Sequence, residues 1–190
     1  MDEIFANDAK LLSKARRGDE ASFLDLYQRY RRPVFQFAWR LTGSEAAAED
    51  VAQESFLALL DGADYDPAQG GLRTYLLGIA RHRAMRRVRA SEHEADEPAS
   101  ESGASTEPDA LRLLLEAERA DMVGRAIGSL PVAQREALIL FEYEDLSLEE
   151  IAQVTGSESG AVKARLFRAR EALRKRLAPL LAAPAARSSR

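Results

Sequence analysis

The stretch SLEEIAQVTGSESGAVKARLFRAREALRKRL, residues 147–177, predicts two helices joined by a tight turn. Ser147 followed by Glu150 is the pattern of a capping box, which satisfies the first free backbone N–H groups of a helix. Gly156 supplies a residue that adopts positive φ without strain, as the turn requires. The second helix has one apolar face, formed by residues at helical spacing: Val162, Leu166, Ala169 and Leu173.

The opposite face of the second helix is basic. A short helix, a turn and a longer basic helix match the helix-turn-helix that enters the major groove of DNA. Lys163 and Arg168 are expected to read base edges, because long cationic donors suit the acceptors of guanine. Phe167 either contacts a thymine methyl group or a sugar, or packs internally. Three further arginines are expected to bind phosphates or to stay solvated: Arg165, Arg170 and Arg174. The alternative is a solvated basic helix of an ordinary bundle.

The net charge of −4 hides a strong segregation of charge along the 190 residues. Residues 72–90 contain six arginines and no acid, and residues 162–176 contain seven basic residues and one acid. Between them, residues 91–109 contain seven acids and no Lys or Arg. Two basic blocks separated by an acidic one indicate two DNA-facing surfaces on a tether.

The composition excludes several classes of protein. The chain has no cysteine, which rules out disulfides and thiolate metal sites, and its two histidines argue against zinc, so no cofactor or metal is expected. No apolar run is long enough to cross a bilayer, and the acidic first ten residues do not resemble a signal peptide. We therefore expect a cytoplasmic protein without membrane insertion.

Strand patterns are nearly absent, and Ala, Leu, Glu and Arg dominate, so the sequence predicts an all-α fold of two helical domains joined by a flexible acidic linker. The predicted domains are 1–90 and 110–180, with a linker at 91–109 and a tail at 181–190. Pro33 is expected to kink or split the first helix. The expected helices are 19–42, 44–60, 72–89, 110–129, 131–143, 147–155 and 157–177.

Several short strings occur in an order that resembles the bacterial extracytoplasmic-function (ECF) sigma factors of the sigma-70 family. In the N-terminal half these are FQFAWRLTG at 35–43, AEDVAQESF at 48–56 and LRTYLLGIAR at 72–81. In the C-terminal half they are LPVAQREAL at 130–138, LSLEEIA at 146–152 and GAVKARLFRAR at 160–170. The resemblance covers about residues 19–177 and implies two domains, called region two and region four.

The resemblance implies that the helix at 44–60 binds core RNA polymerase. Asp50, Gln53, Glu54 and Leu57 lie at i, i+3, i+4 and i+7 and so share one face of this helix. A polar, acidic face with one leucine suits docking to a basic coiled coil, which in the family is formed by the β′ clamp helices. The β subunit is the second expected contact. Without the resemblance, a solvated acidic face would be the preferred interpretation.

The resemblance also implies that residues 61–71 and the following helix recognise and melt the minus-ten element of promoter DNA. Six residues are candidates for this contact: Tyr65, Arg73, Tyr75, Arg81, Arg83 and Arg86. The aromatics would stack on bases and the arginines would hold the backbone, although both tyrosines could equally be core or rim residues. His82 stands where Asn is frequent and Met85 where Asp is frequent, so the bases that are recognised stay open.

Region four would read the minus-thirty-five element through four residues: Lys163, Ala164, Phe167 and Arg168. The sequence thus predicts a non-catalytic sigma factor, expected to serve a stress or envelope response under the control of an anti-sigma factor. Two other classes stay open. A regulator with a sensor domain would bind DNA without polymerase, and an enzyme acting on nucleic acid would need a metal cluster or nucleophile that the sequence does not contain.

Overall fold

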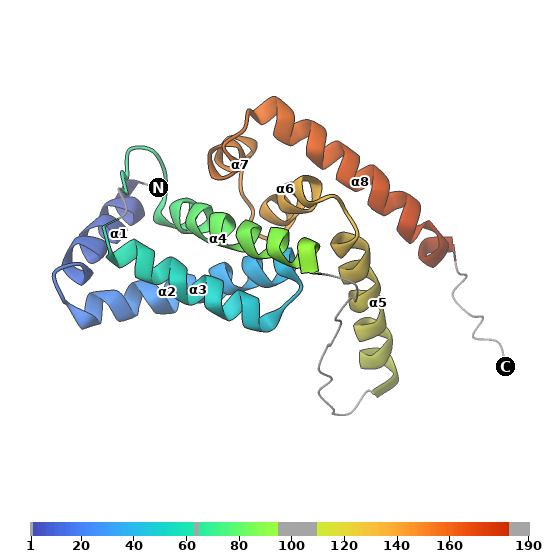
Figure 1. The fold of residues 1–190 in the computed structure, drawn as a ribbon, viewed down its shortest axis with the longest axis horizontal. Coiled ribbons are helices and arrows are strands. Elements are labelled where there is room, and N and C mark those ends of the chain that lie inside the picture. The colour runs from blue at the N-terminus through green and yellow to red at the C-terminus, as the bar shows by residue number, and fades with distance from the viewer. Residues whose placement is uncertain (1, 63–64, 95–109, 183–190) are drawn as a thin grey trace.

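The computed structural model describes residues 2–62, 65–94 and 110–182, and within these residues the chain forms eight helices and no strand (Figure 1). The all-α prediction is therefore confirmed. The expected linker at 91–109 and tail at 181–190 lie almost wholly outside the described residues. The helices are α1 (Asp2–Ala15), α2 (Glu20–Thr42), α3 (Glu45–Leu60), α4 (Leu72–Glu94), α5 (Ala110–Gly128), α6 (Val132–Glu142), α7 (Leu148–Thr155) and α8 (Ser159–Ala182).

Helices α1–α4 form the N-terminal bundle, in which α2 packs against the other three. Five large side chains of α2 at helical spacing are buried: Leu26, Tyr30, Val34, Phe37 and Leu41. Pro33 does not split the helix, since α2 runs unbroken through it. Packing against α1, α3 and α4 supports the turns on both sides of the proline, and this outweighs the lost backbone hydrogen bond.

A glycine and a serine form the junction between α2 and α3. Gly43 ends α2 in the left-handed conformation, with φ of 73°, and its N–H bonds to the carbonyl of Trp39. The side chain of Ser44 then caps α3 by accepting a hydrogen bond from the N–H of Ala47 at 3.3 Å. These caps fix where α3 begins, and therefore which side chains it turns toward solvent.

Helix α1 was not predicted from the sequence. Its anchor is Asp8, a carboxylate only 1% exposed, which accepts hydrogen bonds from Arg29 at 2.6 Å and from the Tyr30 hydroxyl. Burial raises the pKa of Tyr30 above its usual range, and the hydrogen bond to Asp8 adds to this rise. At the other end of α1, Arg16 donates to the Leu59 carbonyl at the end of α3. Both contacts hold α1 on the bundle.

Helices α5–α8 form the C-terminal half. The capping box at α7 is present in full, because Ser147 and Glu150 each bond the other's backbone N–H, and Gly156 ends α7 with φ of 61°. Pro131 lies at the N-cap of α6 instead of in its first turn. Helix α8 begins at Ser159 and continues to Ala182, five residues beyond the predicted end. The helix-turn-helix is confirmed.

The two halves pack against each other. Helix α4 contacts α7, and α2 contacts α5 and α6, so α4 lies between α3 and the C-terminal half (Figure 1). One hydrophobic cluster runs through both halves, with Leu76 and Leu77 of α4 and Leu140 and Ile151 of the C-terminal half among its fully buried members. In the part of the chain described, no helix combines the length and apolar character that a membrane crossing requires.

Candidate polymerase and nucleic-acid interfaces

The predicted acidic face of α3 is exposed. Asp50, Gln53 and Leu57 point away from the core, and Leu57 is an unusually open leucine, with 53% of its surface accessible. Opposite them Val51, Ser55 and Phe56 are buried. The structure therefore brings three of the four candidates onto one open surface, and the fourth, Glu54, lies at its edge.

Glu54 is held by two arginines of α4. Arg83 Nη1 donates to one carboxylate oxygen at 2.8 Å and Arg87 Nη2 to the other at 2.6 Å. Arg87 also lies 3.5 Å from Asp50. The hydrogen bond from Arg87 holds the pKa of Glu54 below its ordinary value, with Arg83 contributing in the same direction. The α3 face is thus a composite of two helices, and sequence reasoning missed the part of Arg87 in it.

The two predicted minus-ten tyrosines contact each other. The rings of Tyr65 and Tyr75 lie 5.5 Å apart, both are half-buried, and both pack against the hydrophobic cluster. The Tyr65 hydroxyl donates to the Gly70 carbonyl at 3.2 Å, and burial raises the pKa of this hydroxyl. Each tyrosine therefore has a packing role at the base of the loop, with part of each ring still accessible.

The arginines of α4 have three different surroundings. Arg83 and Arg87 turn toward Glu54 on α3, as described above. Arg73 and Arg81 turn toward the C-terminal half, where each meets a carboxylate. Arg86 is exposed to solvent. The sequence predicted one cationic track for the DNA backbone, whereas in this conformation only Arg86 among the candidate arginines is fully open.

Contacts between α4 and the C-terminal half are polar as well as apolar. Arg73 Nη2 bonds to Glu144 Oε2 at 2.7 Å, and Arg81 pairs with Glu136. Both carboxylate side chains are only 2% exposed. Thr74 donates to Glu150 at 3.3 Å. None of these pairs was predicted, because the partners are 55 to 76 residues apart and no local pattern links them.

The recognition helix α8 presents the predicted DNA-reading side chains to solvent. Lys163, Phe167 and Arg168 are exposed, Phe167 to 68%, while Ala164 is half-buried. Internal packing of Phe167 is thus ruled out in this conformation. Lys163 and Arg168 make no hydrogen bond or ion pair with the described part of the chain.

The three other candidate arginines of α8 have partners within the chain. Arg165 donates to the Ser157 hydroxyl at 3.2 Å, and Arg170 donates to Glu142 at 2.6 Å. Arg174 pairs with Glu171 one turn away. Because these guanidinium groups have partners within the chain, the unpaired cations of Lys163 and Arg168 stand out as the positions that best fit an external ligand.

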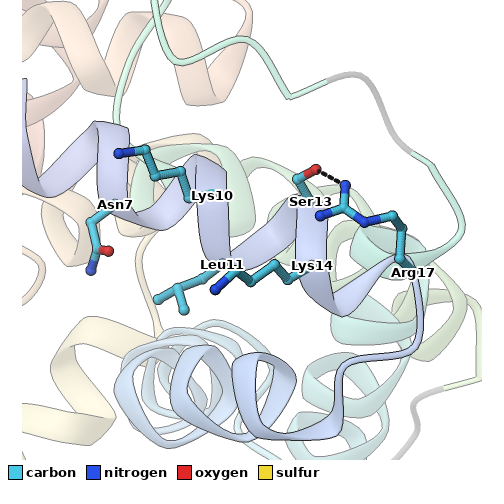
Figure 2. A pocket seen from close by; sticks show the side chains of 6 residues that line it. All are labelled: Asn7, Lys10, Leu11, Ser13, Lys14 and Arg17. Carbon is cyan, nitrogen blue, oxygen red and sulfur yellow. Dashed lines mark hydrogen bonds between the residues drawn. The ribbon is translucent and has the colours of Figure 1, made fainter.

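Two hollows lie on the surface of the described residues. The larger is a cleft of about 630 Å³ between α2, α5 and α6, where Arg40 stacks over the Tyr143 ring at 4.2 Å and Trp39 is exposed. The smaller, about 250 Å³, lies on α1 and is lined by Lys10, Lys14 and Arg17, with Arg17 bonded to Ser13 at 2.7 Å (Figure 2). Among the described residues, no group of three or more His, Cys, Asp or Glu side chains is placed to hold a metal.

In a comparison with known proteins, each half of the chain matches a family model. Residues 26–94 match the family model of Sigma-70 region 2, and residues 120–173 match that of Sigma-70, region 4. The ECF RNA polymerase sigma-E factor of Escherichia coli K12 is 33% identical over 184 residues, which covers 92% of this chain and 96% of that protein.

Two solved structures resemble most of the chain. CnrH in complex with the cytosolic domain of CnrY superposes with a TM-score of 0.68 and 25% identity, covering 91% of this chain and 98% of that one. The sigma factor RpoE in complex with the anti-sigma factor NepR from Bartonella quintana gives 0.63 and 26%, covering 82% and 96%.

Proposed function

Since the chain belongs to the ECF sigma factors of the sigma-70 family, with a region two and a region four, we propose that it directs core RNA polymerase to promoters through three separate surfaces. Sigma factors are transcription initiation factors, not enzymes. The surfaces are the α3 face, the loop before α4 together with α4 itself, and the open face of α8. Below, region two denotes α1–α4 and region four denotes α5–α8.

The α3 face is the proposed contact for the β′ clamp helices, with the β subunit as a second contact of the bound factor. Exposed Asp50, Gln53 and Leu57 support this role, because an acidic face with one accessible leucine fits a basic coiled coil. Glu54 is at the edge and is already neutralised by Arg83 and Arg87, so we expect it to contribute less than Asp50.

The minus-ten surface consists of residues 65–75 and the arginines of α4. Part of the Tyr65 and Tyr75 rings is accessible for stacking on unpaired bases, and Arg86 is open for a phosphate contact. Arg73, Arg81 and Arg83 are the further candidates, and each of them now contacts a carboxylate. Promoter melting therefore requires some of these pairs to exchange their partners.

The α8 face is the proposed reader of the minus-thirty-five element, and it carries the proposal as a whole. Lys163, Phe167 and Arg168 are exposed together on the second helix of a helix-turn-helix whose first helix is capped at both ends. Ala164 lies between them and offers an apolar contact. This arrangement supplies base-edge donors on a rigid element of the right shape for the major groove.

Regulation by a protein inhibitor is the last part of the proposal. RpoE from Bartonella quintana, which resembles this chain along most of its length, was solved in complex with an anti-sigma factor. We infer the same kind of control here, in a stress or envelope response, and place the action in the cytoplasm with the polymerase. The cleft that exposes Trp39 and Tyr143 is a surface such a partner would cover.

The deciding experiment is transcription with purified core polymerase on genomic fragments, with and without the chain. New start sites must depend on its addition, and their absence would refute the proposed function. Arg168→Ala is expected to weaken this transcription while core binding survives. Arg174→Ala is the matched control, because Arg174 is an exposed arginine of the same helix that already pairs with Glu171. Equal loss in both variants would remove the assigned role of Arg168.

A further inference from the structure

Two arginines of the proposed minus-ten surface are bound by region four. The Arg73 guanidinium contacts both the backbone carbonyl and the carboxylate of Glu144, with the latter at 2.7 Å. Arg81 uses Nε and Nη2 on the two carboxylate oxygens of Glu136. Charge-assisted, two-point contacts of this kind are the ones that guanidinium groups also make to phosphate. Each carboxylate thus engages the donor groups with which these arginines would bind a DNA phosphate.

These pairs are enclosed. The side chains of Glu136 and Glu144 are 2% exposed, so water cannot replace the arginines as their partners. Burial raises the pKa of Glu144, while Arg73 and Arg40 nearby oppose the rise. Arg73 and Arg40 of region two are thus nearby cations that favour the charged form of Glu144. Removing either arginine without opening the contact would leave an uncompensated buried carboxylate.

The contact continues beyond the two ion pairs. Thr74 bonds to Glu150 of α7, and Gln153 of α7 donates to the Gln69 carbonyl at 2.8 Å, in the loop that precedes α4. We call the set of these four pairs the inter-region seam: Arg73–Glu144, Arg81–Glu136, Thr74–Glu150 and Gln69–Gln153. It joins both the loop and the first turns of α4 to region four.

We propose that region four is an intramolecular inhibitor of minus-ten recognition, with Glu136 and Glu144 occupying the arginines that promoter phosphates would otherwise bind. The seam must open before region two engages DNA. This inference rests on the proposed function, because it concerns the same minus-ten surface.

The seam leaves the other two surfaces free. We call the arrangement in which the seam is intact the closed form. Leu57 on the α3 face and Phe167 on the α8 face are both widely exposed in it. The α3 face and the α8 face can therefore be approached by core polymerase and by the minus-thirty-five element while Arg73 and Arg81 are still held by region four. The seam therefore controls contact with the minus-ten element, and it does not control binding of core polymerase or of the minus-thirty-five element.

The first test locks the closed form. The natural chain has no cysteine, so R40C and Y143C introduce one thiol on each side of the region two–region four contact, at side chains that now stack at 4.2 Å and belong to none of the three surfaces. A short bis-maleimide with a cleavable disulfide then links them. The two single variants treated with the same reagent are the matched controls.

We expect the free double variant to crosslink readily. The linked protein should still bind core polymerase but lose promoter-dependent transcription by at least about tenfold, and reductant should restore it. Failure to crosslink, or full transcription by the linked protein, would overturn the inhibition. If the wild-type chain itself supports no transcription, the proposed function fails instead, and crosslinking alone still reports whether the closed form exists.

The second test removes the charges without changing shape. E136Q/E144Q should bind a mixed-sequence single-stranded oligonucleotide at least about tenfold more tightly than the wild-type chain, measured by fluorescence anisotropy. E20Q/E45Q makes the same change in net charge at two exposed helix starts that are not part of the seam, and it is the control. Equal affinities of the two double variants would overturn the proposal. The crosslinking test covers the case in which E136Q/E144Q does not fold.

Discussion

Adjacent side chains on α8 have opposite roles. Leu166 is buried in the hydrophobic cluster, whereas Phe167 is 68% exposed. Leu166→Ala should therefore lower the free energy of unfolding by about 2–5 kcal/mol, because it leaves a cavity. Phe167→Ala should change it by less than about 0.5 kcal/mol and still reduce promoter-dependent transcription. Urea denaturation and transcription with core polymerase measure the two effects.

The pair of substitutions serves as its own control, since both shorten a large apolar side chain of one helix. A large loss of stability in Phe167→Ala would mean that the ring packs in the folded protein. Normal transcription by a stable Phe167→Ala protein would instead show that the open face of α8 is not the reading surface.

The pKa of Glu54 reports on the contact between α3 and α4 at the edge of the α3 face. Its pKa is depressed, chiefly by the hydrogen bond from Arg87. A depressed acid stabilises the fold above its unfolded pKa, and that stabilisation is lost as the pH falls through the folded pKa. Arg87→Ala should raise the pKa of Glu54 toward its ordinary value and weaken this acid-side loss. Carbon-13 NMR of the glutamate carboxyl groups follows the shift.

Arg89→Ala is the comparison for this titration, because Arg89 is an exposed arginine of the same helix. It should leave the pKa of Glu54 nearly unchanged. An equal shift in both variants would mean that the overall charge of α4, and not the bond from Arg87, sets the pKa.

The turn between α7 and α8 offers a backbone test with two glycines. Gly156 has φ of 61° and open space around it, so Gly156→Ala should cost about 1 kcal/mol through backbone strain alone. Gly160 lies in the first turn of α8 without positive φ and is equally open. Gly160→Ala should instead stabilise by about 0.5–1 kcal/mol. Chemical denaturation gives both signs, and a stabilising Gly156→Ala would contradict the turn.

Local signals explain how much of the fold the sequence predicts. Seven of the eight helices described were expected, because capping residues, glycine ends and apolar spacing each act within a few residues. Among the site residues, the same local spacing places Asp50, Gln53 and Leu57 on one face and Lys163, Phe167 and Arg168 on another. Their exposure agrees with the faces that were predicted, while their binding roles stay predictions.

What the sequence could not supply is contact between distant residues. Helix α1 was missed because its anchor, Asp8, is a charged residue that no apolar pattern marks as buried. Pro33 was expected to kink or split α2, because a local pattern does not show that α2 packs against three other helices. Glu136 and Glu144 look like solvated acids for the same reason, and only the fold shows that Arg81 and Arg73 enclose them.

In the whole molecule, the hydrophobic cluster and the seam make one unit of two regions. Leu76 and Leu77 belong to the same buried cluster as Leu140 and Ile151, although a linker separates their helices in the chain. A shared apolar core favours cooperative unfolding, and the enclosed ion pairs specify which faces meet. Apolar packing thus stabilises the closed form, and the ion pairs determine which faces of the two regions contact each other.

This division of roles predicts the thermal behaviour of the free chain. The wild-type protein should unfold in one calorimetric transition, with van't Hoff and calorimetric enthalpies in agreement. E136Q/E144Q keeps the apolar contacts but leaves Arg73 and Arg81 without their charged partners. The two regions should therefore separate first and then unfold in two transitions. E20Q/E45Q should retain the single transition. Two transitions already in the wild-type chain would mean that the regions do not share a cooperative core, and that the ion pairs of the seam do not hold the closed form together.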